Sequence, residues 1–287
     1  MDLLAQALMQ GLLIGGTYGI IALGMGLTYG VSGVVNFAHG DFLTLGMFLA
    51  LALFSTFSLD PYISVIVTFP LLVLLGAAVY YLLIRPVVGG HVLMVIQLTL
   101  GISFILQNGL LMIFGGRPQR TPAWIEAKLL LLGDVIVVRT SLVIAFTACV
   151  GLSGFLYWLL TRTDLGRSIR AVHQNPKAAA LMGVNVGRVR MTTFAIGIGI
   201  LALSAALLVP GTPLEPGMGL RYTVIALMTV ILGGMTNFFG ILLGGLVLGV
   251  SEAIGTVYLP GTTGMIVPYA IFILILLLRP KGILGRS

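Results

Sequence analysis

Residues 222–256 read YTVIALMTVILGGMTNFFGILLGGLVLGVSEAIGT and form one almost uninterrupted apolar run of 35 residues. At 1.5 Å per residue, a single helix of that length would measure about 50 Å, whereas the hydrocarbon core of a bilayer is about 30 Å thick. The run also contains Gly233, Gly234 and Gly240. It is therefore predicted to break near these glycines and to make a partial second pass through the membrane.

The rest of the chain is also strongly apolar. Hydrophobic residues make up 59% and charged residues 8%, whereas a soluble domain carries about 25% charged residues. Because the runs are continuous and not alternating, a β-barrel is excluded. The sequence predicts an all-α polytopic membrane protein with eight or nine transmembrane helices, some Gly-rich and broken, in one transmembrane domain spanning 1–287. The spans are placed near 5–29, 39–57, 61–84, 92–114, 140–161, 190–210, 222–256 and 262–279.

Small residues indicate how the spans pack. Gly11, Gly15 and Gly19 recur every four residues in the first span. In lipid, such a stripe lets two helix backbones approach closely. We therefore expect it to be a helix-packing face.

The loop at 162–190 concentrates basic charge between two apolar spans. Six Lys or Arg residues lie there, opposed only by Asp164, and they are Arg162, Arg167, Arg170, Lys177, Arg188 and Arg190. Basic loops remain on the cytoplasmic side of the membrane. The net charge of +7 is thus explained by orientation in the membrane, and no nucleic-acid partner is expected.

A short helix is predicted inside this loop. Asn175 is a favourable N-cap, Pro176 suits the first helical position, and Gly183 can end the helix. Ala178, Ala179, Ala180, Leu181 and Met182 propagate it between these ends. A structured helix outside the bilayer, in a chain with no soluble domain, indicates a surface that a partner pushes or pulls.

The charges also orient the chain. The first 84 residues contain no Lys or Arg, and the tail after the last span contains Arg279, Lys281 and Arg286. The C-terminus is therefore expected in the cytoplasm, the N-terminus outside, and the 115–139 and 211–221 loops outside.

Two similar segments interrupt apolar runs in the two halves of the chain. Residues 33–37 read GVVNF and residues 234–238 read GMTNF. Duplicated, Gly-interrupted spans in transporters point to the translocation route, although a five-residue match in a Gly-rich chain also arises by chance. A pathway is expected to be lined by Asn36, Phe37, His39, Asp41, Asn237, Phe238 and Glu252, with Val34 and Met235 beside them.

Two other readings of these polar residues stay open. The segment around His39 and Asp41 could be a solvated loop at the membrane interface, and Glu252 could pair with a basic group of another helix or subunit. In a secondary transporter, Asp41 and Glu252 would instead bind a coupling ion.

Motifs for enzymatic chemistry are missing from the sequence. It contains no HExxH, GxSxG or GxxxxGK[ST] pattern, its three histidines lack metal-ligand spacing, and Cys149 is its single cysteine. No catalytic residue, metal or cofactor is expected in this chain. A transporter without a P-loop needs its ATPase in a separate subunit.

Several stretches together resemble one family. They are Tyr29–Gly30 through Asn36–Gly40, Leu165–Arg167 through Ala171, Ala180–Val184, Ile231–Gly234, Gly244–Gly245 through Ala253, and Arg279–Gly285. The chain is similar over nearly its whole length to LivH-like permease subunits of branched-chain amino-acid ABC importers. Lys177, Ala178, Ala179 and Gly183 match the spacing of the EAA loop of ABC permeases, with Lys in the place of Glu.

The resemblance implies an inner-membrane subunit that pairs with a homologous LivM-like permease. Two cytoplasmic ATPase subunits, which bind Mg-ATP, and a periplasmic binding protein would complete the importer. The coupling helix would dock on an ATPase through the segment that holds Arg167, Arg170, Asn175, Lys177, Ala178, Ala179, Ala180 and Gly183. The substrate remains open among branched-chain amino acids, urea, short amides, other amino acids and aromatic acids.

Overall fold

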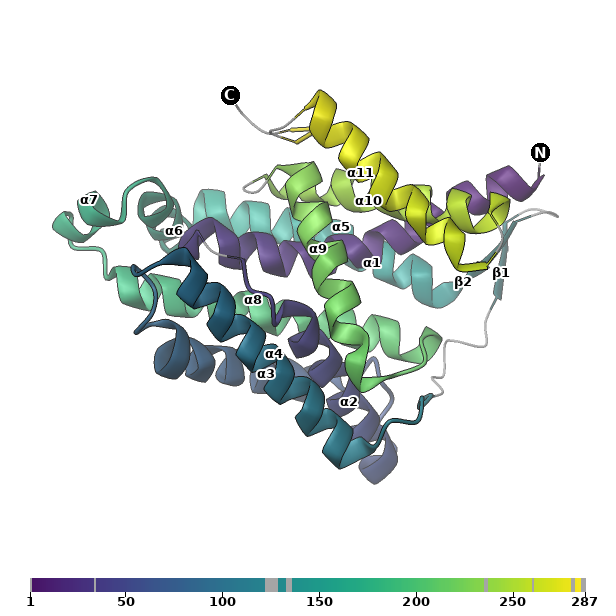
Figure 1. Cartoon of the computed structure of the whole chain (residues 1–287), viewed down its shortest axis with the longest axis horizontal. Coiled ribbons are helices and arrows are strands. Elements are labelled where there is room, and N and C mark those ends of the chain that lie inside the picture. Colours follow the sequence, from purple (N-terminus) through teal and green to yellow (C-terminus); the bar gives the residue numbers. More distant parts are fainter. Residues whose placement is uncertain are drawn as a thin grey trace.

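The computed structural model describes residues 2–33, 35–121, 129–132, 136–234, 237–259, 261–279 and 282–284. Helices dominate them (Figure 1), and the elements are, in chain order, α1 (Asp2–Ser32), α2 (His39–Phe57), α3 (Val65–Val79) with a π-helical turn (Tyr80–Ile84), α4 (Val92–Phe114), β1 (Leu129–Leu132), β2 (Ile136–Arg139), α5 (Thr140–Arg162), α6 (Asp164–Gln174), α7 (Pro176–Leu181), α8 (Val186–Leu208), α9 (Gly219–Gly233), α10 (Phe238–Tyr258) and α11 (Ile266–Leu278). Short 3-10 turns cover Val209–Gly211, Pro216–Met218 and Gly261–Met265.

Among the described residues, eight helices are long and apolar enough to cross a bilayer. This confirms the prediction of an all-α polytopic membrane protein. Residues 222–256 are split at Gly233, as predicted, but α10 is a full-length span and not a partial pass. The short helix is instead the last one, since α11 and its preceding turn give only Thr263–Leu278.

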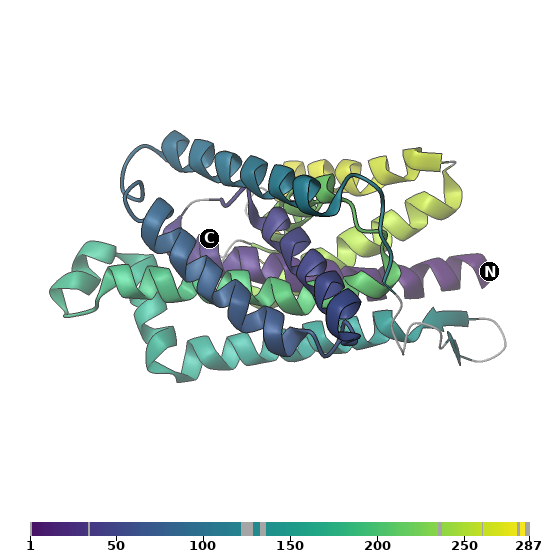
Figure 2. The same ribbon diagram turned by 90° about the horizontal axis from the view of Figure 1, so that it is seen from below.

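The 115–139 loop contains regular structure that the sequence reading did not anticipate. Strands β1 and β2 form an antiparallel hairpin with Leu129 opposite Arg139 and Leu132 opposite Ile136. Four-residue strands of Leu, Val and Ile suit such a pairing. The hairpin lies beside the N-terminus, and α6 and α7 lie at the opposite end of the long axis in both views (Figures 1 and 2).

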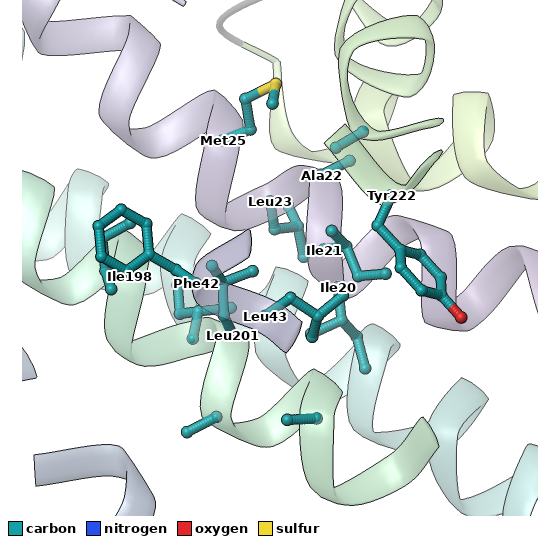
Figure 3. Close-up of a cluster of buried hydrophobic side chains, with 14 of the residues drawn as sticks. Ile20, Ile21, Ala22, Leu23, Met25, Phe42, Leu43, Ile198, Leu201 and Tyr222 are labelled. Carbon is teal, nitrogen blue, oxygen red and sulfur yellow. The ribbon is translucent and has the colours of Figure 1, made fainter. Parts of the chain in front are cut away.

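Two helices form the centre of the protein. Of the apolar windows of α1 and α8, 89% and 78% are buried inside the chain, compared with 22% for α3, α4 and α5. A helix that is apolar on all sides is either buried or faces lipid, so the outer helices turn apolar faces to the membrane. Figure 3 shows Ile20, Leu23 and Met25 of α1 among side chains of α2, α8 and α9.

The glycine stripe of α1 is a packing face, as expected, and its partner is α10. A Cβ atom added to Gly15 would lie 2.7 Å from the Gly245 carbonyl oxygen and from Leu246 Cα, and one added to Gly11 would lie 2.6 Å from Val250 Cα. The two backbones therefore touch where side chains would normally separate them. The order of contacts shows that α1 and α10 run antiparallel.

The first glycines of the two similar segments both have a positive φ. Gly33 follows the last residue of α1 with a φ of 67°, and Gly234 follows the last residue of α9 with a φ of 90°. Glycine adopts this left-handed conformation at little cost, so it ends a helix readily. Val34 and Met235 lie outside the described residues.

Candidate functional site

The first polar group of interest is the start of α2. Asn36 Oδ1 accepts from the Ala38 N–H over 3.1 Å and holds the turn that precedes the helix. His39 Nε2 donates to the Ile21 carbonyl of α1 over 2.9 Å. Helix α2 therefore begins beside Ile21, within the apolar length of α1.

The His39–Asp41 segment is enclosed by the chain. His39 and Asp41 are 0% exposed, which contradicts the reading of a solvated interfacial loop. Asp41 Oδ2 accepts from Ser103 Oγ over 2.5 Å, and its Oδ1 accepts from Gln107 Nε2 over 2.9 Å. Buried carboxylates need such donors because desolvation is costly. Two polar groups of α4 therefore hold Asp41 in place.

The first turn of α9 packs directly on this segment. Gly40 N–H donates to Thr223 Oγ1 over 2.8 Å, and Thr223 Oγ1 donates to the Phe37 carbonyl over 3.2 Å. Gly219 lies against the Asp41 carboxylate, with no room for a Cβ atom. Gly219 and Thr223 are one turn apart and thus share a helix face, and this face fixes the start of α2.

Not every polar atom of this segment has a partner. Among the described residues, Asn36 Nδ2 and His39 Nδ1 are buried without a hydrogen bond. Buried polar atoms without partners are uncommon in folded proteins. Phe37 is partly buried next to them.

Glu252 forms a second polar group and does pair with another helix, as one reading held. Its Oε1 is 3.1 Å from Arg221 Nη2 of α9, and its Oε2 accepts from Tyr18 Oη of α1 over 2.6 Å. The sequence reading placed Arg221 in an outward loop. It lies instead in the first turn of α9. The position of Glu252 within another apolar span could have indicated that a basic partner lies nearby.

The remaining predicted pathway residues, Asn237 and Phe238, lie at the other end of α10. Asn237 Oδ1 accepts from the Gly240 N–H over 3.1 Å and caps α10, while Asn237 Nδ2 donates to the Leu284 carbonyl over 3.4 Å. Phe238 packs against both the main core and the small core of the basic loop. The structure therefore brings Asn36–Asp41 together but places Glu252 and Asn237–Phe238 in separate groups.

The basic loop folds into two helices, of which only α7 was predicted. Asn175 Oδ1 accepts from the N–H groups of Lys177 and Ala178, both at 3.0 Å, Pro176 is the first helical residue, and Gly183 has a φ of 84°. The predicted capping is thus confirmed. Helix α6 was missed, although Thr163 caps it by accepting from Gly166 N–H.

These two helices have a core of their own, which we call the loop core. It consists of the buried residues Leu160, Ile169, Val172, Ala179 and Val189. Ile169 and Val172 are three residues apart on α6, the spacing of a helix face. Ala179 is 5% exposed and belongs to this core, so it faces the chain's own interior and not outward, a correction to its expected place at a partner surface.

The outward face of the loop is apolar at its tip and basic beside it. Leu181 and Met182 are 89% and 85% exposed. Arg170 and Lys177 are exposed as well, and Arg167 pairs with Asp164 on the surface. Ala178, Ala180 and Gly183 are also exposed. Leu181 and Met182 thus form a small exposed apolar patch beside basic side chains.

Within the part of the chain that the structure describes, no three His, Cys, Asp or Glu side chains lie close enough together to hold a metal ion.

Comparison with known proteins gives a consistent picture. The profile of a family described as "Branched-chain amino acid transport system / permease component" matches residues 7–276. The chain is 31% identical to the high-affinity branched-chain amino acid transport system permease protein BraD of Pseudomonas aeruginosa, over 98% of this chain and 95% of that protein. It is 30% identical to LivH of Escherichia coli over the same shares.

A more distant relative is the probable branched-chain amino acid transport permease protein LivH of Methanocaldococcus jannaschii. It is 28% identical over 93% of this chain and 88% of that protein. No solved structure matches the chain.

Proposed function

Because the chain belongs to the family of branched-chain amino acid transport system permease components, we propose that it is the permease subunit of an ATP-driven importer. It carries branched-chain or related amino acids across the bacterial inner membrane, with its C-terminus in the cytoplasm. A homologous second permease pairs with it, and a periplasmic binding protein delivers the solute. Mg-ATP is bound and hydrolysed by two separate ATPase subunits, and this chain has no catalytic role.

The observation that carries this proposal is the basic loop with its exposed tip. Helices α6 and α7 are held by the loop core, so Leu181 and Met182 are presented on a folded platform. The platform contacts the ends of α5 and α8 through Leu160 and Val189. A displacement of the tip would therefore be passed to membrane helices, which is the task of a coupling helix.

The packing of the C-terminal segment supports the assignment of one end of the protein to the cytoplasm. Ile283 N–H donates to the Leu232 carbonyl over 2.7 Å, beside the Asn237 contact with Leu284. Phe238 of the same turn packs on the loop core. The C-terminal segment and the basic loop thus share one end of the protein, which we assign to the cytoplasm. Lys281 and Arg286 lie outside the described residues.

For the translocation pathway we retain the segment at the start of α2. Asn36 Nδ2 and His39 Nδ1 are buried polar atoms in need of partners, and a hydrated solute between the two permeases would supply them when the helices move. In this conformation the Asp41 carboxylate accepts hydrogen bonds from Ser103 and Gln107 of the same chain. The whole of residues 1–287 forms one permease domain that includes the coupling loop 162–190.

The test is a crosslink from the tip of the loop. A Leu181→Cys variant, co-expressed with the proposed ATPase subunits, should crosslink to one of them through a short thiol reagent. The native Cys149 is buried and does not compete. A Leu3→Cys variant is the control, because Leu3 is 71% exposed at the opposite end. Uptake driven by an ion gradient without ATP would overturn the proposal in favour of a secondary transporter.

A further inference from the structure

A second cluster of charged groups lies between α1, α9 and α10. Glu252 accepts from Tyr18 Oη over 2.6 Å and is 3.1 Å from Arg221 Nη2. The Glu252 side chain is 16% exposed and the Arg221 side chain 48% exposed. The pair is therefore anchored on the acidic side by Tyr18 and open on the basic side.

The cluster forms one end of a narrow pocket with an apolar wall. The pocket is open on one side, and besides the three polar residues it is lined by Ile225, Met228, Leu248, Met265, Pro268 and Tyr269. These residues come from α9, α10 and the start of α11 with its preceding turn. Opposite charges and an aliphatic wall thus meet in one place.

Both charged groups have capacity for a further partner. A guanidinium carries five N–H donors, and the contact with Glu252 is made through Nη2. A carboxylate has about four acceptor positions, and Tyr18 and Arg221 each use one of them. Because a half-exposed ion pair adds little net stability, Arg221 can turn toward another anion without a large loss.

We propose that this pocket is a subsite for the zwitterionic head group of an amino acid on its way through the permease. The α-carboxylate binds the Arg221 guanidinium, whose planar donors match a carboxylate. The α-ammonium binds Glu252, which Tyr18 holds in position. An aliphatic side chain then lies on Met265 and Tyr269, which are 37% and 42% exposed.

The position of the pocket suits entry from outside. Arg221 is in the first turn of α9 and Glu252 is in the second half of α10. The opposite end of α10, at Phe238, packs on the loop core. The subsite therefore lies toward the end that carries the N-terminus, away from the coupling loop. This inference rests on the proposed function and names the chemistry of its solute.

Photo-leucine, a leucine analogue with a diazirine in its side chain, is the probe. It is delivered by the binding protein to the complete importer in nanodiscs, activated by light, and located by mass spectrometry. We expect labels on Met265 or Tyr269, the exposed residues of the pocket wall. In Arg221→Met the yield should fall by about tenfold, because a hydrogen bond to a charged group contributes at least that much affinity. Arg117→Met, which removes an exposed arginine elsewhere, is the control and should keep the wild-type yield.

If the Arg221→Met variant does not assemble into an importer, the Arg221→Lys variant provides the test. It keeps the positive charge and the partner of Glu252 but loses the planar pair of donors, so its yield should lie between wild type and Arg221→Met. A structural ion pair without a ligand role would give Arg221→Lys the wild-type yield in assembled complexes, and this result would overturn the inference.

Uptake of radiolabelled leucine by the wild-type importer separates the two proposals. Uptake without labels on the pocket wall would refute the subsite and leave the proposed function standing. Failure of both uptake and labelling would refute both.

Discussion

Ser103 of α4 donates its hydroxyl to Asp41 of α2 across 2.5 Å, and Gln107, one turn later on α4, donates to the other oxygen across 2.9 Å. Two neutral side chains thus satisfy a carboxylate with no exposed surface. The contact joins a peripheral helix to the place where α2 begins inside the protein.

Asp41→Ala should therefore destabilise the protein more than Asp41→Asn does. The alanine leaves the buried Ser103 hydroxyl without its acceptor, at about 1–3 kcal/mol, and removes one of the two acceptors of Gln107, whose Nε2 also donates to Ser103 Oγ. Asparagine keeps one acceptor and adds an N–H donor that Ser103 Oγ can accept. Thermal unfolding of the purified protein in detergent, followed by circular dichroism, measures the difference. Equal melting temperatures for the two variants would show that these hydrogen bonds do not support the fold.

The contact between α1 and α10 should tolerate no side chain. In Gly15→Val, the new Cβ atom would meet the Gly245 carbonyl and Leu246 Cα at 2.7 Å, and overpacking of this kind costs about 1–3 kcal/mol or more. We expect a lower melting temperature and a lower yield of assembled importer. Gly101→Val is the matched control, because a Cβ atom at Gly101 has no neighbour within 4 Å. An equal loss in both variants would contradict the packing role.

Substitutions in the coupling loop should separate stability from coupling. Leu181→Ser should leave the free energy of unfolding within about 0.5 kcal/mol of wild type, since this side chain is exposed, yet reduce the solute transported per ATP hydrolysed. Ala179→Trp should instead disrupt the loop core and lower stability.

Both variants are compared by uptake and phosphate release in proteoliposomes. If Leu181→Ser transports normally, the tip of α7 is not the contact with the ATPase.

Phe238 should matter for coupling because it touches both the main core and the loop core. Removal of its ring leaves a cavity between them, and since the side chain is partly buried the cost should be below the roughly 3–5 kcal/mol of a fully buried Phe→Ala change. We expect Phe238→Ala to hydrolyse more ATP for each solute imported. Phe104→Ala, at a position 62% exposed, is the control, and an unchanged ratio in Phe238→Ala would argue against a linking role.

Local signals in the sequence were sufficient for most of the spans and for α7, but not for the full length of α10. Asn175 and Gly183 act through atoms a few residues away, so their capping roles follow from the sequence alone. The glycines near 233 likewise predicted the break between α9 and α10.

Partners from distant helices could not be predicted in the same way. The hydrogen bonds of Asp41 to Ser103 and Gln107 depend on which spans are neighbours in the folded protein. When apolar spans have similar compositions, their order along the chain does not indicate which of them pack together. The pairing of Arg221 with Glu252 was hidden for a related reason, since Arg221 was assigned to a loop and not to a helix. Helix α6 was missed although Ile169 and Val172 have helical spacing.

The antiparallel contact of α1 with α10 also has a consequence for synthesis. Gly15 and Gly245 are 230 residues apart, so at about 5–20 residues per second the ribosome needs roughly 10–50 s to make the second after the first. During that interval the glycine face of the first helix has no partner of its own. The nascent chain must therefore reach nearly its full length before α1 and α10 can pack together.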